Sequence, residues 1–238
     1  NPFDKQNVFE IFRNIMHQHE LSEHYVQITQ IGGMTNRNFK VTWSNESYVL
    51  RIPGNGTEGM IVRENEDYNS RLAYQLKITP EIFYLDVQSG VKLVRYIEGA
   101  ETLNNATIQY MNHIEKVIMV LRTLHTSGVR FNNDFNVFKE IEIYEELLGR
   151  VKGWMYEGYS ELRPSIFALA DRLNQLGVTL TPCHNDLVAE NFVKGLDGKI
   201  HLIDWEYSGM NDPLWDLAAL FIESSFSEEN LQRALLLY

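Results

Sequence analysis

The residues with the greatest chemical potential lie in two neighbouring segments of the chain. The first reads His184-Asn-Asp-Leu-Val-Ala-Glu-Asn191 and the second reads Ile203-Asp-Trp-Glu-Tyr207. Carboxylate and amide oxygens, such as those of Asp186, Asn191 and Asp204, are the ligands that hard cations such as Mg²⁺ prefer, with waters and substrate phosphates filling the remaining positions. The two segments therefore predict an oxygen-lined cation site, provided that the fold brings them together.

A short hairpin is the element that would position these oxygens. Residues 192–194 and 200–203 have the pattern of two strands, and Asp197-Gly198 between them is a pair that tolerates the positive φ of a tight turn. In an antiparallel hairpin the start of one strand lies beside the end of the other, so we expect Asn191 next to Asp204. Either segment alone is equally compatible with an Asx-capped turn or an ordinary strand end.

The same two segments resemble known kinase motifs. The first is similar to the H-x-D-x-x-x-x-N catalytic loop of protein-kinase-like and aminoglycoside-phosphotransferase-like kinases, and Asp204 is similar to their metal-binding aspartate. The continuation to Glu223 resembles the choline kinase signature, with Asn211 and Trp215-Asp216 at matching positions. From Gly32-Gly-Met-Thr-Asn36 onward, the chain is similar to bacterial choline kinases of the choline/ethanolamine kinase family.

This resemblance implies roles for six residues of the second half of the chain. Asp186 would be the catalytic base that accepts the substrate hydroxyl proton, and Asn191 and Asp204 would hold Mg²⁺. The pocket for a quaternary ammonium group would be lined by Glu206, Tyr207 and Glu223. Carboxylates would compensate the cation's charge and the aromatic face would attract it. The alternatives are a half-buried packing ring for Tyr207 and a solvated helix residue for Glu223.

The first half of the chain would hold the nucleotide. The phosphate-contacting loop would contain Gly32, Gly33, Thr35 and Asn36, where glycine allows a close backbone approach. A plain Gly-Gly hairpin is the alternative. The adenine base would pair with the backbone of Tyr96 and Ile97 at a hinge.

Arg51 occupies the strand position at which protein kinases place a lysine. Its ion-pair partner would be Glu66 on the following helix, and the guanidinium could engage phosphate bidentately. The alternative is a strand-to-helix salt bridge without a ligand.

Hydrophobic periodicity predicts an α+β chain with two lobes, and the kinase resemblance implies that these lobes form a protein-kinase-like fold. An N-terminal antiparallel-sheet lobe over 1–97 would precede a mostly helical C-terminal lobe over 98–238. Strands are expected over 26–31, 39–43, 48–52, 82–85 and 91–97, and helices over 8–15, 61–76, 108–124, 137–148 and 165–176. The helix over 61–76 would bury the stripe Ile61, Tyr68, Leu72 and Leu76, and the last helix would begin after Pro164.

Composition and charge limit the classes of partner and the cellular setting expected for the chain. The 238 residues include 21 Lys and Arg against 32 Asp and Glu, a net charge of −11 that disfavours nucleic acid. No apolar run reaches the roughly 20 residues of a membrane span. Cys183 is the single cysteine, so no intramolecular disulfide can form and a cytoplasmic setting is expected. The apolar helical pattern still runs at Tyr238, so we expect a piece of a longer protein.

The resemblance implies an ATP- and Mg²⁺-dependent kinase that phosphorylates the hydroxyl of choline. Ethanolamine, thiamine and aminoglycosides remain alternative substrates, and a catalytically silent nucleotide-binding module is the alternative from another class. His125 is expected to be structural, near the end of its helix. The aromatic residues Trp154, Tyr156 and Tyr159 could pack beneath a loop or border a cation pocket.

Overall fold

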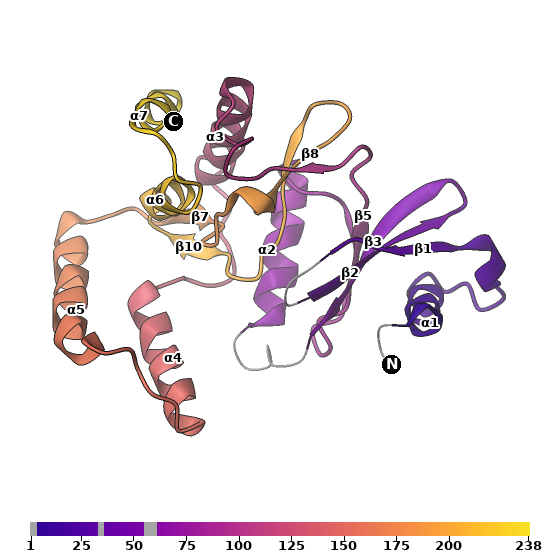
Figure 1. Ribbon diagram of the computed structural model, residues 1–238, viewed down its shortest axis with the longest axis horizontal. Coiled ribbons are helices and arrows are strands. Elements are labelled where there is room, and N and C mark those ends of the chain that lie inside the picture. The colour runs from indigo at the N-terminus through magenta and orange to yellow at the C-terminus, as the bar shows by residue number, and fades with distance from the viewer. Residues whose placement is uncertain (1–3, 33–35, 55–60) are drawn as a thin grey trace.

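The computed structural model describes residues 4–32, 36–54 and 61–238. It has a sheet-rich N-terminal part and a mostly helical C-terminal part, as the sequence predicts (Figure 1). The predicted positions Gly33 and Thr35 lie outside the described residues.

The N-terminal part is built on one antiparallel sheet. Its strands are arranged in the order β1 (Gln27–Gln30), β2 (Asn36–Trp43), β3 (Glu46–Pro53), β5 (Lys92–Arg95) and β4 (Ile82–Leu85). A two-residue turn joins β2 to β3, and both of its residues, Ser44 and Asn45, have positive φ, 52° and 63°. Such turns match the natural twist of a hairpin, so this connection fixes the register of β2 against β3.

The two faces of this sheet differ in chemistry. Helix α1 (Lys5–Ile15) buries Val8, Phe9 and Phe12 in a core shared with Leu50 and Ile52 of β3. Side chains alternate along a strand, so Arg51 points to the other face, as predicted. There it is buried too, because its guanidinium binds Glu66 of helix α2 (Arg63–Gln75).

The buried stripe of α2 differs from the prediction. Tyr68 is 48% exposed, and Leu72 and Leu76 are only partly buried. The residues that α2 does bury are Arg63, Glu66, Asn69, Ser70 and Ala73, four of which are polar or charged. Hydropathy assigns such residues to a solvent face, but here each polar side chain finds partners inside the protein.

The second core lies in the C-terminal part, around helix α3 (Met111–His125). Around α3 are the small sheets β6 (Glu101–Thr102), β8 (Phe192–Lys194), β9 (Ile200–Leu202) and β7 (Thr181–Cys183), β10 (Gly209–Asn211), and the helices α6 (Pro213–Glu223) and α7 (Glu228–Leu237). Two short 3₁₀ turns, Glu23–Tyr25 and Ala189–Asn191, complete the elements of the described residues beside α4 and α5. This core also includes Ala73 and Ile78, so the predicted boundary after residue 97 stays a prediction.

Helices α4 (Val137–Arg150) and α5 (Tyr159–Leu176) stand apart from both cores at one side of the molecule (Figure 1). Neither helix has a fully buried residue. Helix α5 begins six residues before the predicted start, and Pro164 lies in its second turn, where it removes one backbone hydrogen bond. Tyr159 and Arg163 both bind Glu145 of α4 and so hold that first turn in place.

None of the described helices is both long and apolar enough to cross a membrane.

Candidate active site

The predicted hairpin forms and brings Asn191 beside Asp204. Strands β8 and β9 are antiparallel, with Phe192 opposite Leu202, and Gly198 in the turn has a φ of +76°. Beyond the last pair, the Ile203 N–H donates to the carbonyl of Asn191 at 2.9 Å. The open end of this hairpin is therefore the place at which the two predicted segments meet.

Asp186 enters at the same end. The Asn191 side-chain amide donates from Nδ2 to the backbone carbonyl of Asp186 at 2.8 Å, which closes the loop between them. This bond leaves Asn191 Oδ1 as an acceptor, and the Asp186 side chain is half-buried. The structure thus brings together the three residues whose oxygens the sequence singled out.

Asp204 is the most unusual of the three. Its backbone is left-handed, with φ +67°, and its Oδ1 is buried without a hydrogen-bond partner among the described residues. Arg51 Nη1 lies 3.7 Å from that oxygen. Burial, and next the charge of Glu206, raise the pKa of Asp204, while Arg51 opposes them. A buried oxygen without a donor, beside a second carboxylate, fits a cation.

Buried charges lie next to this hairpin end; we call Arg51, Arg63, Glu66, Lys92 and Glu206 the charge cluster. Glu66 is fully buried and binds Arg51 at 2.8 Å, Arg63 at 2.9 Å and Lys92 at 3.0 Å. Burial alone would raise the pKa of Glu66, but Lys92 and Arg51 hold it well below its usual range. The Arg51–Glu66 pair that the sequence predicts is present, with two further cations.

Glu206 lies within the charge cluster, which differs from the expected ammonium pocket. Its Oε1 binds Arg51 Nη1 at 3.0 Å and Arg63 Nη1 at 2.8 Å, and the Asn36 amide is 3.3 Å away. A carboxylate that two guanidinium groups already neutralise has little charge left for a third cation. The chain turns at residues 206–207, and the side chains of Glu206 and Tyr207 therefore lie in different surroundings.

Tyr207 meets a residue that the sequence did not single out, Tyr144 of α4. The two phenolic oxygens are 3.4 Å apart. Burial, and next the Tyr144 contact, raise the pKa of Tyr207, and the charges of Asp186 and Glu206 add to that effect. The phenol of Tyr207 therefore stays neutral and lies within the field of Asp186.

Glu223 ends α6 and is exposed. At 1.5 Å per residue it lies about 10 Å along the helix from Asp216. Its backbone carbonyl accepts a hydrogen bond from the Asn105 side chain at 3.2 Å. Among the described residues, no hydrogen bond joins Glu223 to Tyr207.

The remaining predicted nucleotide contacts lie near the ends of strands of the first sheet. Gly32 has a φ of +98° with open space around it, and its carbonyl accepts from the Asn38 N–H at 3.1 Å. Tyr96 donates its N–H to Ser47, and its ring lies 3.8 Å from Lys40 Nζ. Ile97 accepts from the Ala100 N–H. These contacts describe the backbone at the predicted hinge and leave the adenine role of Tyr96 and Ile97 a prediction.

The sequence missed two cations of the charge cluster, Arg63 and Lys92. Arg63 had a readable signal, because it stands three residues before Glu66 on one helix and such residues are neighbours on a helix surface. Lys92 had none, since its partner lies on a separate element.

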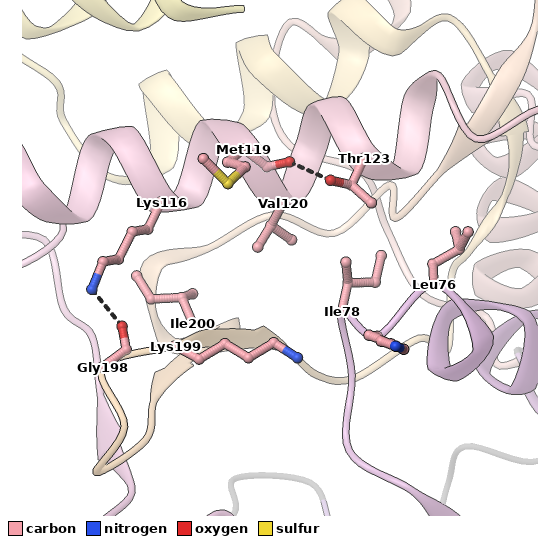
Figure 2. A pocket seen from close by; sticks show the side chains of 10 residues that line it. Leu76, Ile78, Lys116, Met119, Val120, Thr123, Gly198, Lys199 and Ile200 are labelled. Atoms are coloured by element: carbon pink, nitrogen blue, oxygen red, sulfur yellow. Dashed lines mark hydrogen bonds between the residues drawn. The ribbon is translucent and has the colours of Figure 1, made fainter.

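A cavity of about 340 Å³ lies at the other end of the β8–β9 hairpin (Figure 2). It is bounded by Ile78, Val120 and Ile200, and Lys116 Nζ donates to the Gly198 carbonyl at its rim. None of the predicted site residues lines it, so it is separate from the candidate active site.

Comparisons with known proteins identify the family of this chain. The family model described as choline/ethanolamine kinase matches residues 27–233. The LicA protein of Haemophilus influenzae is 38% identical over 213 residues, which cover 89% of this chain and 62% of that protein. The chain thus spans less than two thirds of the length of this relative. Human ethanolamine kinase 2 is 26% identical over 186 residues, 74% of this chain and 46% of that protein.

Solved structures give the same result for the fold. The crystal structure of choline kinase LicA from Streptococcus pneumoniae superposes with a TM-score of 0.84 at 38% identity, covering 96% of this chain and 79% of that one. A second LicA structure, in complex with AMP, gives 0.82 over the same shares. The predicted protein-kinase-like fold is therefore confirmed. The extent of the family match and the identity to LicA together show that the chain belongs to the choline/ethanolamine kinase family.

Proposed function

We propose that the chain transfers the γ-phosphoryl group of ATP to the hydroxyl of choline, giving phosphocholine and ADP. The observation that carries this proposal is the hairpin end at which Asp186, Asn191 and the buried oxygen of Asp204, which has no hydrogen-bond donor among the described residues, meet beside Arg51. The names of the LicA relatives, a choline kinase and a complex with AMP, support both the substrate and the nucleotide.

Mg²⁺ fits the donors at this hairpin end. Asn191 Oδ1 and the Asp204 carboxylate would hold it, since both offer oxygen and Asp204 Oδ1 is without a hydrogen-bond donor among the described residues. The bound ion would neutralise the charge of the ATP phosphates. Burial and the charge of Glu206 raise the pKa of Asp204, and a bound cation would oppose both effects.

The charge cluster would face the phosphates. Arg51 lies 3.7 Å from Asp204, and both Arg51 and Arg63 bind Glu206. We propose that Glu206 orients these two guanidinium groups, rather than binding the ammonium group. Gly32, Gly33, Thr35 and Asn36 would approach the phosphates from the loop before β2, with Tyr96 and Ile97 at the adenine.

The substrate would lie on the Asp186 side. Asp186 orients the choline hydroxyl and accepts its proton as the oxygen attacks the γ-phosphorus, and ADP leaves with the bridging oxygen. The rings of Tyr207 and Tyr144 would offer faces to the quaternary ammonium. Glu223 would supply a more distant negative charge. A cytoplasmic setting, expected from the single cysteine, belongs to this proposal.

The test is ADP release from MgATP by the purified protein with choline, ethanolamine, thiamine and kanamycin, each run in parallel. Choline should give the largest kcat/KM, and Asp186→Asn should lower it at least 100-fold, as expected for loss of a general base. Asp186→Asn should still bind nucleotide, which calorimetry with MgADP measures. Turnover within a few-fold of the parent would exclude the Asp186 role, and a larger kcat/KM with another alcohol would replace choline as substrate.

The substrate pocket has its own test. Tyr207→Leu and Glu223→Gln should raise the KM for choline and leave the KM for ATP unchanged, whereas Glu206→Gln should act on the KM for ATP. A choline-specific effect of Glu206→Gln would return Glu206 to the ammonium pocket.

A further inference from the structure

The cavity at the turn of the β8–β9 hairpin lies outside the candidate active site and has an apolar floor (Figure 2). Ile78 follows α2, Val120 belongs to α3 and Ile200 begins β9, and all three side chains are buried. Met119 of α3, 66% exposed, adds a flexible apolar side chain to the lining. We call this space the hairpin cavity. Its volume of about 340 Å³ lies within the range of small-molecule sites.

Three lysines surround this apolar floor: Lys77 after α2, Lys116 of α3 and Lys199 at the hairpin turn. Among the described residues, no acidic side chain lines the hairpin cavity. The whole chain has 21 Lys and Arg against 32 Asp and Glu, a net charge of −11. The hairpin cavity therefore has the opposite charge to the molecule as a whole, and a local positive charge attracts anions.

The protein does not neutralise these three charges itself. Lys116 Nζ donates to the carbonyl of Gly198, which is an uncharged acceptor. Within the part of the chain that the structure describes, neither Lys77 nor Lys199 makes a side-chain hydrogen bond or an ion pair. Lys194 of β8, on the same hairpin, differs because it binds the carboxylate of Glu101. The lysines of the hairpin cavity are thus available to an anionic ligand.

The backbone at Lys77 does not need a lysine. Its φ is +62°, in the left-handed region that favours glycine at the end of a helix. The Lys77 N–H donates to the Tyr74 carbonyl at 2.8 Å and the Ile78 N–H to the Ala73 carbonyl at 3.3 Å, which together close α2. Lys77→Gly would therefore remove the charge and keep this helix end, so it separates binding from folding.

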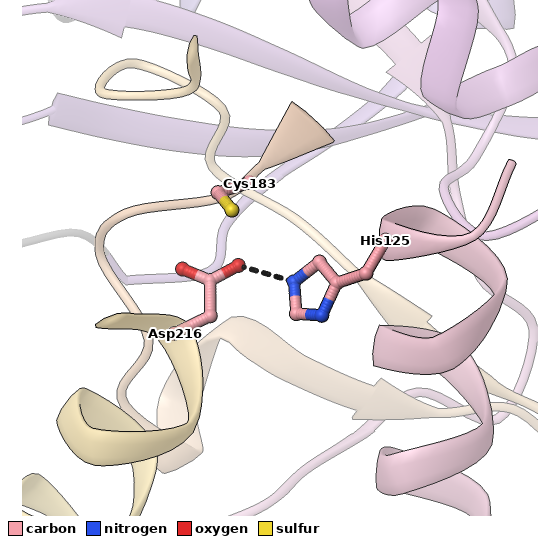
Figure 3. Close-up of side chains that lie close together, drawn as sticks. All are labelled: His125, Cys183 and Asp216. Carbon is pink, nitrogen blue, oxygen red and sulfur yellow. Dashed lines mark hydrogen bonds and ion pairs between the residues drawn. The ribbon is translucent and has the colours of Figure 1, made fainter. Parts of the chain in front are cut away.

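A second cluster of chemically capable side chains, His125, Cys183 and Asp216, differs from the hairpin cavity because its polar atoms bind one another or the nearby chain (Figure 3). His125 Nε2 lies 3.0 Å from Asp216 Oδ2, and His125 Nδ1 lies 2.7 Å from the Tyr238 hydroxyl. Cys183 Sγ contacts the Asn211 carbonyl at 3.5 Å. Burial raises the pKa of the Cys183 thiol, which opposes the thiolate that a metal needs. This cluster is therefore explained by contacts within the protein, whereas the three lysines are not.

We propose that the hairpin cavity binds a small anionic amphiphile, a molecule with one carboxylate or phosphate group on an apolar chain. The apolar chain would lie on Ile78, Val120 and Ile200, where it leaves water. The anionic group would lie among the three lysines, which select its charge. This site is distinct from the one at which the proposed phosphoryl transfer takes place.

Isothermal titration calorimetry of the purified protein with octanoate tests the proposal. Octanoate should bind at least about 10-fold more tightly than acetate, which has the carboxylate without the chain. It should also bind at least about 3-fold more tightly than octanamide, which has the same chain without the charge. The affinity for octanoate should fall as the salt concentration rises from about 0.05 to about 0.5 M. Equal affinities for octanoate and octanamide would overturn the proposal.

A double variant locates the bound octanoate. Lys77→Gly combined with Lys199→Gln should weaken octanoate binding at least about 10-fold, because two of the three cations are lost. The matched control is Lys194→Gln, which removes a lysine of the same hairpin that already has an acidic partner and should keep the affinity within about 2-fold. Thermal unfolding checks that both proteins are folded. An unchanged affinity in the double variant, or an equal loss in the control, would overturn the proposal.

Competition separates the hairpin cavity from the candidate active site. Saturating MgADP and choline should leave the affinity for octanoate within about 2-fold, because none of the predicted site residues lines the hairpin cavity. Displacement of octanoate by either would place it in the active site and overturn the proposal. Binding to phosphatidylglycerol vesicles without binding of free octanoate would assign the lysines to a membrane surface and overturn it too. These measurements need no turnover, so their outcome is independent of the proposed function.

Discussion

Helices α2 and α3 each bury one face, but the buried faces are opposite in chemistry. Helix α3 buries mainly apolar side chains, including Ile114, Val117, Leu121 and Leu124, in the larger core. Helix α2 buries Arg63, Glu66, Asn69, Ser70 and Ala73. Apolar burial stabilises whatever the exact neighbours are, whereas buried polar groups stabilise only with every partner in place. The buried side chains of α2, the helix beside the candidate site, are therefore held in defined positions. The same helix tolerates substitution of its buried residues less well than α3 does.

The partners of α2 come from across the molecule. Glu66 binds Arg51 of β3 and Lys92 of β5, and Asn69 binds Ser208 and Asn133 of the C-terminal part. Because these contacts join the sheet, the helix and the C-terminal part of the chain, α2 fixes the position of one part against the other. Five predictions, from the largest expected effect to the smallest, test this contrast with α3.

The largest effect is expected for Glu66→Gln. Removing the carboxylate leaves three buried cations with too few negative partners, which should lower the free energy of unfolding by about 3–5 kcal/mol. Urea denaturation followed by tryptophan fluorescence measures the change. Glu64→Gln, on the exposed face of the same helix, should change stability by less than about 0.5 kcal/mol. Equal effects of the two substitutions would refute the contrast.

The effect of Glu66 should also depend on pH. Its pKa is lowered in the folded state, so its contribution is present above the ordinary carboxyl pKa of about 4.3 and is lost as the pH falls further. The stability difference between the parent and Glu66→Gln should therefore shrink as the pH falls from about 7 to about 3. A difference that grows towards acid pH would contradict the sign of the shift.

On α3, Leu121→Ala should lower the free energy of unfolding by about 3 kcal/mol, because it deletes buried methyl groups and leaves a cavity. In contrast to Glu66→Gln, this loss should be the same at every pH between about 4 and 8, since no charge is involved. Met119→Ala, at a position 66% exposed on the same helix, is the control. A pH-dependent loss of stability for Leu121→Ala would contradict the claim that α3 is stabilised by apolar burial rather than by charge.

Asn69→Ala should cost about 1–3 kcal/mol, because it leaves the Asn132 N–H and the Ser208 carbonyl with fewer partners in a buried place. The matched control is Asn112→Ala on the exposed face of α3. Thermal unfolding with both proteins at one concentration measures the difference. Stability equal to that of the control would show that these bonds are replaced by water.

The smallest effect is expected for Asp67→Ala, which removes the ion pair with Arg71 on the outer face of α2. The two residues are four apart and 2.8 Å from each other, but partly exposed, so the loss should be about 0.3–0.5 kcal/mol and should vanish in high salt. A loss that persists in about 1 M salt would assign this pair a role beyond surface electrostatics.

The elements of this fold were largely predictable, because hydrophobic period and turn chemistry are local. The β8–β9 hairpin follows from Asp197-Gly198, and α3 follows from its apolar repeat. The buried face of α2 was not, because the sequence pairs Glu66 with Arg51 but Asn69 looks solvated until its partners on other elements are known. Pro164 misled in the same way, since its helix starts one turn earlier with bonds to α4.

The candidate site also contains residues whose positions follow from local sequence and one whose position does not. Asp186, Asn191 and Asp204 were placed together by strand geometry, which a sequence displays directly. Glu206 was assigned to the ammonium pocket together with Tyr207, its neighbour in the motif. The direction of its side chain depends on Arg51 and Arg63, which lie about 150 residues earlier in the chain.

Cys183 is a natural probe for local opening of the protein. It is the single cysteine of the sequence, it is completely buried, and it stands one residue before the catalytic loop. A thiol reagent can reach its sulfur only when β7 separates from its surroundings, so the rate of labelling counts those openings. Comparing the labelling rate with and without nucleotide then measures how often the region around this loop opens in each state. No probe has to be added to the chain.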